Sequence, residues 1–233
     1  MNEKVKSELI THLSSFLSEE RIGKFDEVLL SRTRKITVVL EDLYQSHNAS
    51  AVIRSCEIFG IQDIHVIEKN NKFSTNNEIS VGSAGWVDIY NYRNGSEFDS
   101  ASCYYRLKKA GYSIVATTPA ENSKGLDSIN IENKIALLFG TEEYGLSKQA
   151  IENSDYSVRI PMYGFTESFN VSVACSLILR DLTERLRHSN SNWNLSEEES
   201  SDIKYSWLMK SVKNSDLIVK RFLKERVIPS YKS

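Results

Sequence analysis

Five polar side chains are candidates for chemistry, because each lies in a segment that follows a predicted strand. They are Asn48, Arg54, Glu142, Ser168 and Asn170. In open α/β sheets, ligands bind beyond the carboxyl ends of the strands, where connecting loops carry polar groups. A guanidinium, a carboxylate, a hydroxyl and two amides suit an anionic or hydroxyl-bearing ligand. The residue types alone indicate nothing narrower.

Each of these side chains also has a purely structural interpretation. Asn48 and Arg54 are six residues apart, about 120° from a common helix face at ~3.6 residues per turn. Asn48 is therefore expected to be an N-cap or a loop residue that reaches the site from above. The structural alternative for Arg54 is an ion pair with Glu142. For Ser168 and Asn170 it is local hydrogen bonding within a loop.

Alternating strands and helices are predicted around these residues, and this order indicates an α/β fold with a parallel sheet. Strands are predicted at residues 36–40, 63–67, 87–90, 114–117, 134–139 and 156–160, and helices at 48–59, 100–110 and 171–186, with two more in 3–34 and a short one after 147. Residues 69–98 are interpreted mainly as loop. Residues 134–139 are almost uninterruptedly apolar, as expected for a strand covered on both faces.

Residues 160–172 are predicted to start as an irregular loop and to end as the first turn of a helix. Pro161 stops the preceding strand because it has no N–H to donate to a sheet ladder, and Gly164 permits a turn. From Val171 onward, apolar residues recur at helical spacing. The polar residues between strand and helix are therefore either a turn with an N-cap or part of a functional site.

Composition narrows the class of protein. With 40% hydrophobic and 26% charged residues among 233, the chain matches soluble globular proteins. A net charge of -2 and a pI near 6.1 give no global electrostatic reason for nucleic-acid binding, so RNA binding would depend on local patches. Three widely spaced cysteines, an N-terminus unlike a signal peptide and no apolar run near ~18 residues favour a reduced, cytoplasmic setting.

Several common motifs are absent from the sequence. The first strand is not followed by G-x-G-x-x-G, and neither the G-x-x-x-x-G-K-[ST] phosphate loop nor the G-x-S-x-G nucleophile elbow occurs. Neither H-E-x-x-H nor a Cys/His cluster is present. No metal site is therefore predicted.

Three stretches resemble, in order, the three motifs of the SpoU family of RNA 2′-O-ribose methyltransferases. They are residues 48–54 (NASAVIR), 137–147 (LLFGTEEYGLS) and 160–172 (IPMYGFTESFNVS). The resemblance covers roughly residues 36–187, and it is greatest to the members that methylate guanosine 18 of tRNA. Residues 81–86 follow the family's Ser/Gly-rich segment only loosely.

This resemblance implies a parallel α/β sheet with a deep C-terminal trefoil knot (the SPOUT type). It implies an N-terminal helical extension at residues 1–35, a knotted methyltransferase domain at 36–187 and a C-terminal helical extension at 188–233. It further implies S-adenosylmethionine as the cofactor, tRNA or another structured RNA as the partner, and a homodimer. The positions that match the cofactor pocket are Thr117, Leu138, Gly140, Ile160, Met162, Ser168 and Phe169.

The resemblance also implies roles for the polar residues. Arg54 matches the arginine that activates the ribose 2′-hydroxyl, although a guanidinium stays protonated in proteins and is a poor base. Glu142 and Asn170 match positions that shape the site and orient the substrate. Ser168 matches a position near both cofactor and substrate, and Asn48 belongs to the same catalytic set.

Two alternatives for the function stay open. One is the same chemistry at another tRNA position or on ribosomal RNA, and the other is a catalytically silent RNA-binding module. The tail from residue 195 places an acidic cluster before a basic helical region. This order suits either a helix dipole or an RNA-phosphate patch.

Overall fold

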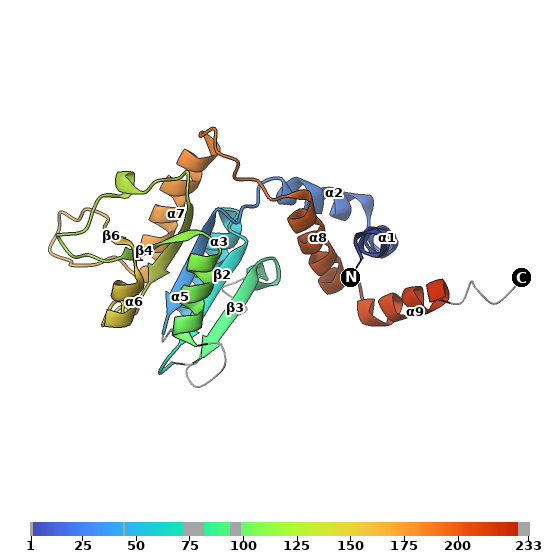
Figure 1. Ribbon diagram of the computed structural model, residues 1–233, viewed down its shortest axis with the longest axis horizontal. Coiled ribbons are helices and arrows are strands. Elements are labelled where there is room, and N and C mark those ends of the chain that lie inside the picture. Colours follow the sequence, from blue (N-terminus) through green and yellow to red (C-terminus); the bar gives the residue numbers. More distant parts are fainter. Residues whose placement is uncertain (1, 44, 72–81, 94–98, 228–233) are drawn as a thin grey trace, which may run out of the picture. The chain divides into compact units, whose positions relative to one another are not determined.

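A six-stranded parallel sheet is the framework of residues 33–193 (Figure 1). The structure is a computed structural model, and it describes residues 2–43, 45–71, 82–93 and 99–227. The strands are β1 (Ile36–Glu41), β2 (Asp63–Glu68), β3 (Asp88–Arg93), β4 (Tyr112–Thr117), β5 (Lys134–Phe139) and β6 (Tyr156–Val158). Their order is β3-β2-β1-β5-β4-β6, and each pairing is parallel. The prediction of a parallel α/β sheet is confirmed.

Helices cover both faces of this sheet. One face is covered by α3 (Ser46–Ile58) and α7 (Val171–Arg187), and the other by α5 (Ser100–Lys109) and the short α6 (Lys148–Asn153). Short 3-10 turns occur at Ser83–Gly85 and Leu126–Ser128. The α3 and α7 helices, more than a hundred residues apart in sequence, pack against each other, and this contact brings the first and third motifs close in space.

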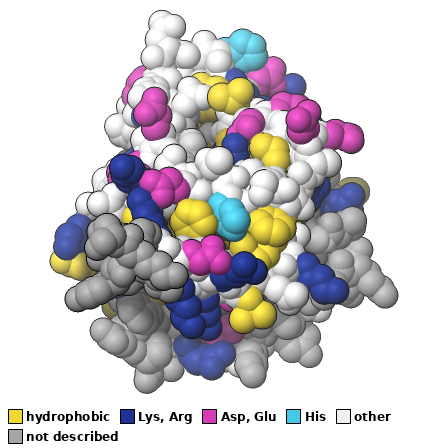
Figure 2. Space-filling view, turned by 90° about the vertical axis from the view of Figure 1, so that its right-hand side faces the viewer, with side chains coloured by type: hydrophobic (Ala, Val, Ile, Leu, Met, Phe, Trp, Pro, Cys, Tyr) yellow, Lys and Arg dark blue, Asp and Glu magenta, His cyan; other side chains and the backbone are white. Residues whose placement is uncertain are grey.

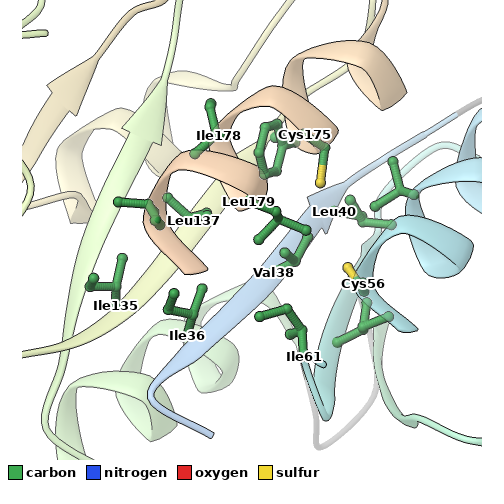
Figure 3. Close-up of a cluster of buried hydrophobic side chains, with 14 of the residues drawn as sticks. Ile36, Val38, Leu40, Cys56, Ile61, Ile135, Leu137, Cys175, Ile178 and Leu179 are labelled. Carbon is green, nitrogen blue, oxygen red and sulfur yellow. The ribbon is translucent and has the colours of Figure 1, made fainter. Parts of the chain in front are cut away.

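Side-chain alternation along the central strands explains why both faces are apolar. Along β5, Leu137 joins the core under α3 and α7, whereas its neighbour Leu138 joins the core under α5 and α6. Figure 3 shows Val38 and Leu40 of β1 beside Leu179 and Cys175 of α7. Successive strand residues point to opposite faces, so a strand covered on both sides is apolar throughout. The prediction for residues 134–139 is thus confirmed.

The last strand is shorter than predicted. Hydrophobicity predicts a strand over residues 156–160, but β6 ends at Val158. The Arg159 N–H donates to the Lys124 carbonyl (2.9 Å), and the chain then enters the Pro161 loop. Ile160 is apolar and so looks like a strand residue in the sequence, but the strand ends two residues before it. Of the segment 81–86, Val81 lies outside the described residues.

The chain divides into two compact units, Thr33–Trp193 and a helical unit made of Met1–Arg32 with Asn194–Ser233. The helical unit contains α1 (Glu3–Ser14), α2 (Glu19–Leu29), α8 (Glu197–Ser211) and α9 (Ser215–Val227). Ser196 and Glu199 form a reciprocal capping box at the start of α8. Within the described ranges, no helix combines the length and apolar character needed to cross a membrane.

Candidate active site

Side chains from the three polar segments meet in one hydrogen-bonded group. Asn48 Nδ2 donates to a carboxylate oxygen of Glu142 and to Gln45 Oε1 (3.1 Å). Asn170 Nδ2 donates to Asn48 Oδ1 (3.1 Å). Segments that are 94 and 122 residues apart are therefore joined through a single amide, which we call the Asn48–Glu142–Asn170 network.

Asn48 lies inside α3 rather than at its cap, which corrects the expectation from sequence. The N-cap position is taken by Gln45, whose side chain makes no cap hydrogen bond. Asn48 is only 4% exposed. A buried amide needs partners for both its donor and its acceptor. Asn48 finds them in Glu142 and Asn170, and in Gln45 at the N-cap of its own helix.

Asn170 does cap a helix, and the cap orients the rest of its side chain. Its Oδ1 accepts from the Ser172 N–H (2.9 Å) and from Ser172 Oγ (2.6 Å) at the start of α7. Because the oxygen is occupied by the cap, the amide nitrogen is directed toward Asn48. The helix cap and the contact with Asn48 are therefore made by the two ends of one amide.

Arg54 lies on the exposed side of α3, whereas Asn48 is buried. This difference is what their ~120° separation on the helix predicts. The guanidinium is thus presented at the surface of the same helix whose first turn contributes to the network.

A cavity of about 500 Å³ opens beside the network. Its lining residues come from the ends of β4, β5 and β6, the loops that follow them, and α7: Thr117, Thr118, Pro119, Phe139, Gly140, Thr141, Glu142, Glu143, Tyr144, Gly145, Leu146, Ile151, Val158, Arg159, Ile160, Met162, Glu167, Ser168, Phe169, Val171, Ala174 and Ile178. The volume falls within the range of small-molecule sites, roughly 300–1,000 Å³. Six of the seven residues expected for a cofactor pocket lie in this lining.

Leu138 is the expected pocket residue that is not part of the cavity lining. Its side chain is fully buried in the core under α5 and α6. Strand alternation explains the difference, because Phe139 faces the opposite side and does reach the cavity. Leu138 contributes its carbonyl, which accepts from Thr117 Oγ1 (2.7 Å) and so fixes a neighbouring lining side chain.

Position 140 requires a glycine, because neighbouring backbone atoms leave no room for a Cβ. A Cβ at this position would lie 2.2 Å from the Gly145 carbonyl carbon and 2.4 Å from the Leu146 nitrogen. Thr141 and Gly145 exchange backbone hydrogen bonds of 3.1 and 3.0 Å, and Gly145 has a φ of +66°. The close contact that a side chain would make at position 140 is with the tightly folded loop of residues 140–147.

Exposed aromatic side chains lie on the loops around the cavity. Tyr144 and Phe169 belong to its lining and are 80% and 41% exposed, while Tyr163 and Phe165 are almost fully exposed. A hydrogen bond to the Glu143 carboxylate raises the pKa of Tyr144. Sequence reasoning selected Phe169 alone. The signal for Tyr163 and Phe165 is their position on either side of Gly164.

The cysteines are not candidates for nucleophiles. All three are free and buried. Burial raises the pKa of Cys103 to about 12 and that of Cys175 well above its usual range. A thiol must ionise to attack, so these two remain protonated core side chains near neutral pH.

Comparison with known proteins identifies the family. Residues 35–180 match the SpoU rRNA Methylase family. The chain belongs to the SpoU family. It is 43% identical, over 88% of its length and 92% of the relative's, to a tRNA (guanosine(18)-2′-O)-methyltransferase of Borreliella burgdorferi.

Solved SpoU structures have the same fold. The A. aeolicus TrmH/SpoU tRNA modifying enzyme superposes with a TM-score of 0.74 at 30% identity, covering 84% of this chain and 98% of that one. The SpoU methyltransferase AviRb from Streptomyces viridochromogenes, crystallised with AdoMet, superposes with a TM-score of 0.59 at 20% identity, covering 70% and 65%. The first of these matches extends beyond the sheet, since it covers more of the chain than residues 33–193.

Proposed function

We propose that this protein transfers a methyl group from S-adenosylmethionine to the ribose 2′-hydroxyl of guanosine 18 in tRNA. The observation that carries the proposal is the convergence of Asn48, Glu142 and Asn170 beside the cavity. Membership in the SpoU family and the activity named for the Borreliella relative supply the substrate class.

The cavity has the chemistry that this cofactor requires. Apolar Ile160, Met162 and Phe169 offer surfaces for an adenine ring, and Thr117 and Ser168 add hydroxyls. When bound, the cofactor supplies a methyl group made electrophilic by its sulfonium. The residues of this chain have to hold it, exclude water and present the ribose.

Arg54 is assigned to the ribose hydroxyl. Methyl transfer would form a C–O bond at the 2′-oxygen and break the methyl–sulfur bond of the cofactor, so that S-adenosylhomocysteine leaves. The hydroxyl proton passes to solvent water, and negative charge develops on the 2′-oxygen as the proton departs. A fixed guanidinium stabilises such charge without accepting a proton itself. In this proposal Asn48, Glu142 and Asn170 orient the ribose, and Ser168 lies between cofactor and substrate.

The trefoil knot is part of the proposal. Its support is the path of the chain around β6, which lies between two segments. On one side β6 pairs with β4, and on the other Val158 forms a parallel bridge with Lys124. The chain leaving β4 therefore crosses to the far side of β6 before it returns to form β5. A C-terminal segment that passes through this crossing would be knotted, a rare exception to ordinary topology.

We further propose that the protein is a homodimer and acts in the cytoplasm. We also propose that its helical unit contacts RNA. On the face drawn in Figure 2, Lys and Arg side chains are interspersed with Asp and Glu, in keeping with the net charge of -2. RNA contacts would then depend on local groups of basic residues. Sedimentation at micromolar concentration tests the dimer directly.

The decisive experiment incubates the protein with labelled cofactor and unmodified tRNA, followed by mapping of ribose methylation at nucleotide resolution. We expect label at the 2′-oxygen of guanosine 18. Label elsewhere in tRNA or in ribosomal RNA would reassign the target, and cofactor binding without transfer to any RNA would indicate a silent binding module. Arg54→Ala is the matched inactive variant, and it should retain cofactor binding.

A further inference from the structure

Glu41, a buried carboxylate outside the three motifs, accepts hydrogen bonds from Ser147 at the end of the loop that carries Glu142. Glu41 is the last residue of β1, and its side chain is only 3% exposed. It accepts from the Ser147 N–H (2.8 Å), from Ser147 Oγ (2.7 Å) and from Lys69 Nζ (2.7 Å). The Tyr104 hydroxyl lies 3.4 Å from Glu41 Oε1, the oxygen that also accepts from Ser147 Oγ and Lys69. A buried charge this well paired is costly to disturb.

The next residue fixes the direction of Lys69. Asp42 adopts a φ of +56°, and its Oδ1 accepts from the backbone N–H groups of Lys69, Asn70 and Asn71 at 2.8–2.9 Å. This arrangement holds the loop after β2, so that Lys69 Nζ reaches both Glu41 and Ser147 Oγ (2.8 Å). Glu41 and Asp42 together connect β1 to the segments that follow β2 and β5.

Ser147 is the far end of the loop that starts at Gly140. It also caps α6 by accepting from the Ala150 N–H (3.2 Å). The Thr141–Gly145 bridge makes the loop compact, so we expect a shift at Ser147 to displace Glu142 as well. Glu142 in turn accepts from Asn48, and this chain of contacts leads from Glu41 to the Asn48–Glu142–Asn170 network.

We propose that Glu41 is a positioning residue for methyl transfer, acting through Ser147 on the loop that carries Glu142. This inference rests on the proposed function. Among the described residues, the groups that point at the Glu41 carboxylate all donate to it. Glu41→Gln would therefore place an amide N–H₂ against donors, and the loop would lose one of its two fixed ends.

We expect Glu41→Gln to lower kcat by roughly 10- to 100-fold, the range that small displacements of a catalytic group produce, with the KM for tRNA little changed. Ser147→Ala should lower kcat by a smaller factor. If Glu41 acts through Ser147, the double variant loses no more than Glu41→Gln alone. Losses that multiply would show that Glu41 acts elsewhere, and would overturn the inference.

Asp63→Asn is the matched control. Asp63 is also a largely buried, ion-paired carboxylate, with Arg34 at 3.1 Å, but it lies at the opposite end of the strands. This variant should lose stability and keep kcat. If Asp63→Asn lost as much kcat as Glu41→Gln, the effect of Glu41 would be a general one on folding, and the inference would be overturned. If Glu41→Gln does not fold, Lys69→Met replaces it in the same cycle with Ser147→Ala.

Hydrogen exchange supplies a readout that does not depend on activity. The amides of residues 141–147 should exchange faster in Glu41→Gln than in the wild type or in Asp63→Asn. Unchanged protection of this loop would overturn the positioning role even if the wild type proved inactive. Failure of the wild type to methylate any RNA would instead overturn the proposed function.

Discussion

Asn170 uses the two ends of its amide for two purposes, and the two can be separated by substitution. Asn170→Asp keeps an oxygen that caps α7, since Asp and Asn are comparable N-caps, but it removes the Nδ2 donor to Asn48. Leaving the buried Asn48 oxygen unpaired costs about 1–3 kcal/mol. We therefore expect the melting temperature to fall by the equivalent of this cost, and methyl transfer to fall about ten- to hundredfold because Asn48 is no longer held in place.

The matched variant is Asn170→Ala, which loses both the cap and the donor. It should lose activity to the same degree, and about 1 kcal/mol more stability than Asn170→Asp because the cap is lost as well. Calorimetry and single-turnover methylation of both variants distinguish the two contributions. Full activity in Asn170→Asp would remove the Asn48 contact from the mechanism.

His65 makes stability depend on pH, independently of the site. Burial, and secondarily the positive charge of Arg106, lower its pKa to about 4, while its ring stacks on Tyr90 and its Nδ1 lies 3.1 Å from the Tyr92 hydroxyl. In the unfolded chain the His65 ring takes up a proton near pH 6.5, whereas in the folded protein it stays neutral down to about pH 4. The free energy of unfolding is therefore highest above pH 6.5. It decreases as the pH falls toward 4.

Between pH 7 and pH 5 this difference amounts to about 2 kcal/mol of unfolding free energy. Urea titrations at the two pH values measure it, and His65→Gln is the control that should remove most of the dependence. The same pH dependence in the variant would assign the effect to other groups.

At the scale of elements, the loop after β5 depends on a residue without a side chain. Gly140→Ala would drive a Cβ into the backbone of Gly145 and Leu146, and backbone atoms cannot move aside cheaply. Since Gly140 and this loop line the cavity, we expect cofactor affinity to fall at least tenfold, with a lower melting temperature. Isothermal titration with S-adenosylmethionine measures the affinity.

Gly164→Ala is the matched control for this prediction. A Cβ there meets nothing within 4 Å, and Gly164 is not part of the cavity lining. It should leave affinity and stability close to the wild type. Equal losses in the two variants would mean that the Gly140 contact is not what fixes the loop.

These elements show how far sequence reasoning extends. Hydrophobic periodicity located the strands and helices to within a few residues, because burial on one or both faces imposes it. The end of β6 was missed, because Ile160 is apolar but has no ladder partner. Polar residues on loops indicated Asn48 and Asn170, but their direct contact depends on the packing of α3 against α7. No local pattern encodes that contact. Glu41 is not indicated by the sequence either, because its contact with Ser147 joins segments 106 residues apart.

At the scale of the whole molecule, the two terminal segments form one compact unit. The sequence predicts two helices within residues 3–34 and a basic helical region after residue 195, without indicating that they pack together. Leu9 and Leu13 of α1 are fully buried, and Phe25 of α2 contacts Trp207 of α8 edge-to-face at 5.5 Å. Glu8 and Arg226 are ion-paired across 218 residues of sequence. Contacts at such separations cannot be derived from the pattern of either segment alone.

This organisation predicts that removing one terminal segment does more damage than removing both. Deleting residues 194–233 takes away α8 and α9 and exposes Leu9, Leu13 and Phe25, so we expect dye binding and aggregation. Deleting 1–32 together with 194–233 leaves residues 33–193, which hold their own core and every residue that lines the cavity. This shorter chain should unfold cooperatively and bind S-adenosylmethionine. Its methylation of tRNA should fall, because RNA contacts are proposed for the helical unit. Aggregation of the doubly truncated chain, or full tRNA methylation by it, would contradict this division of roles.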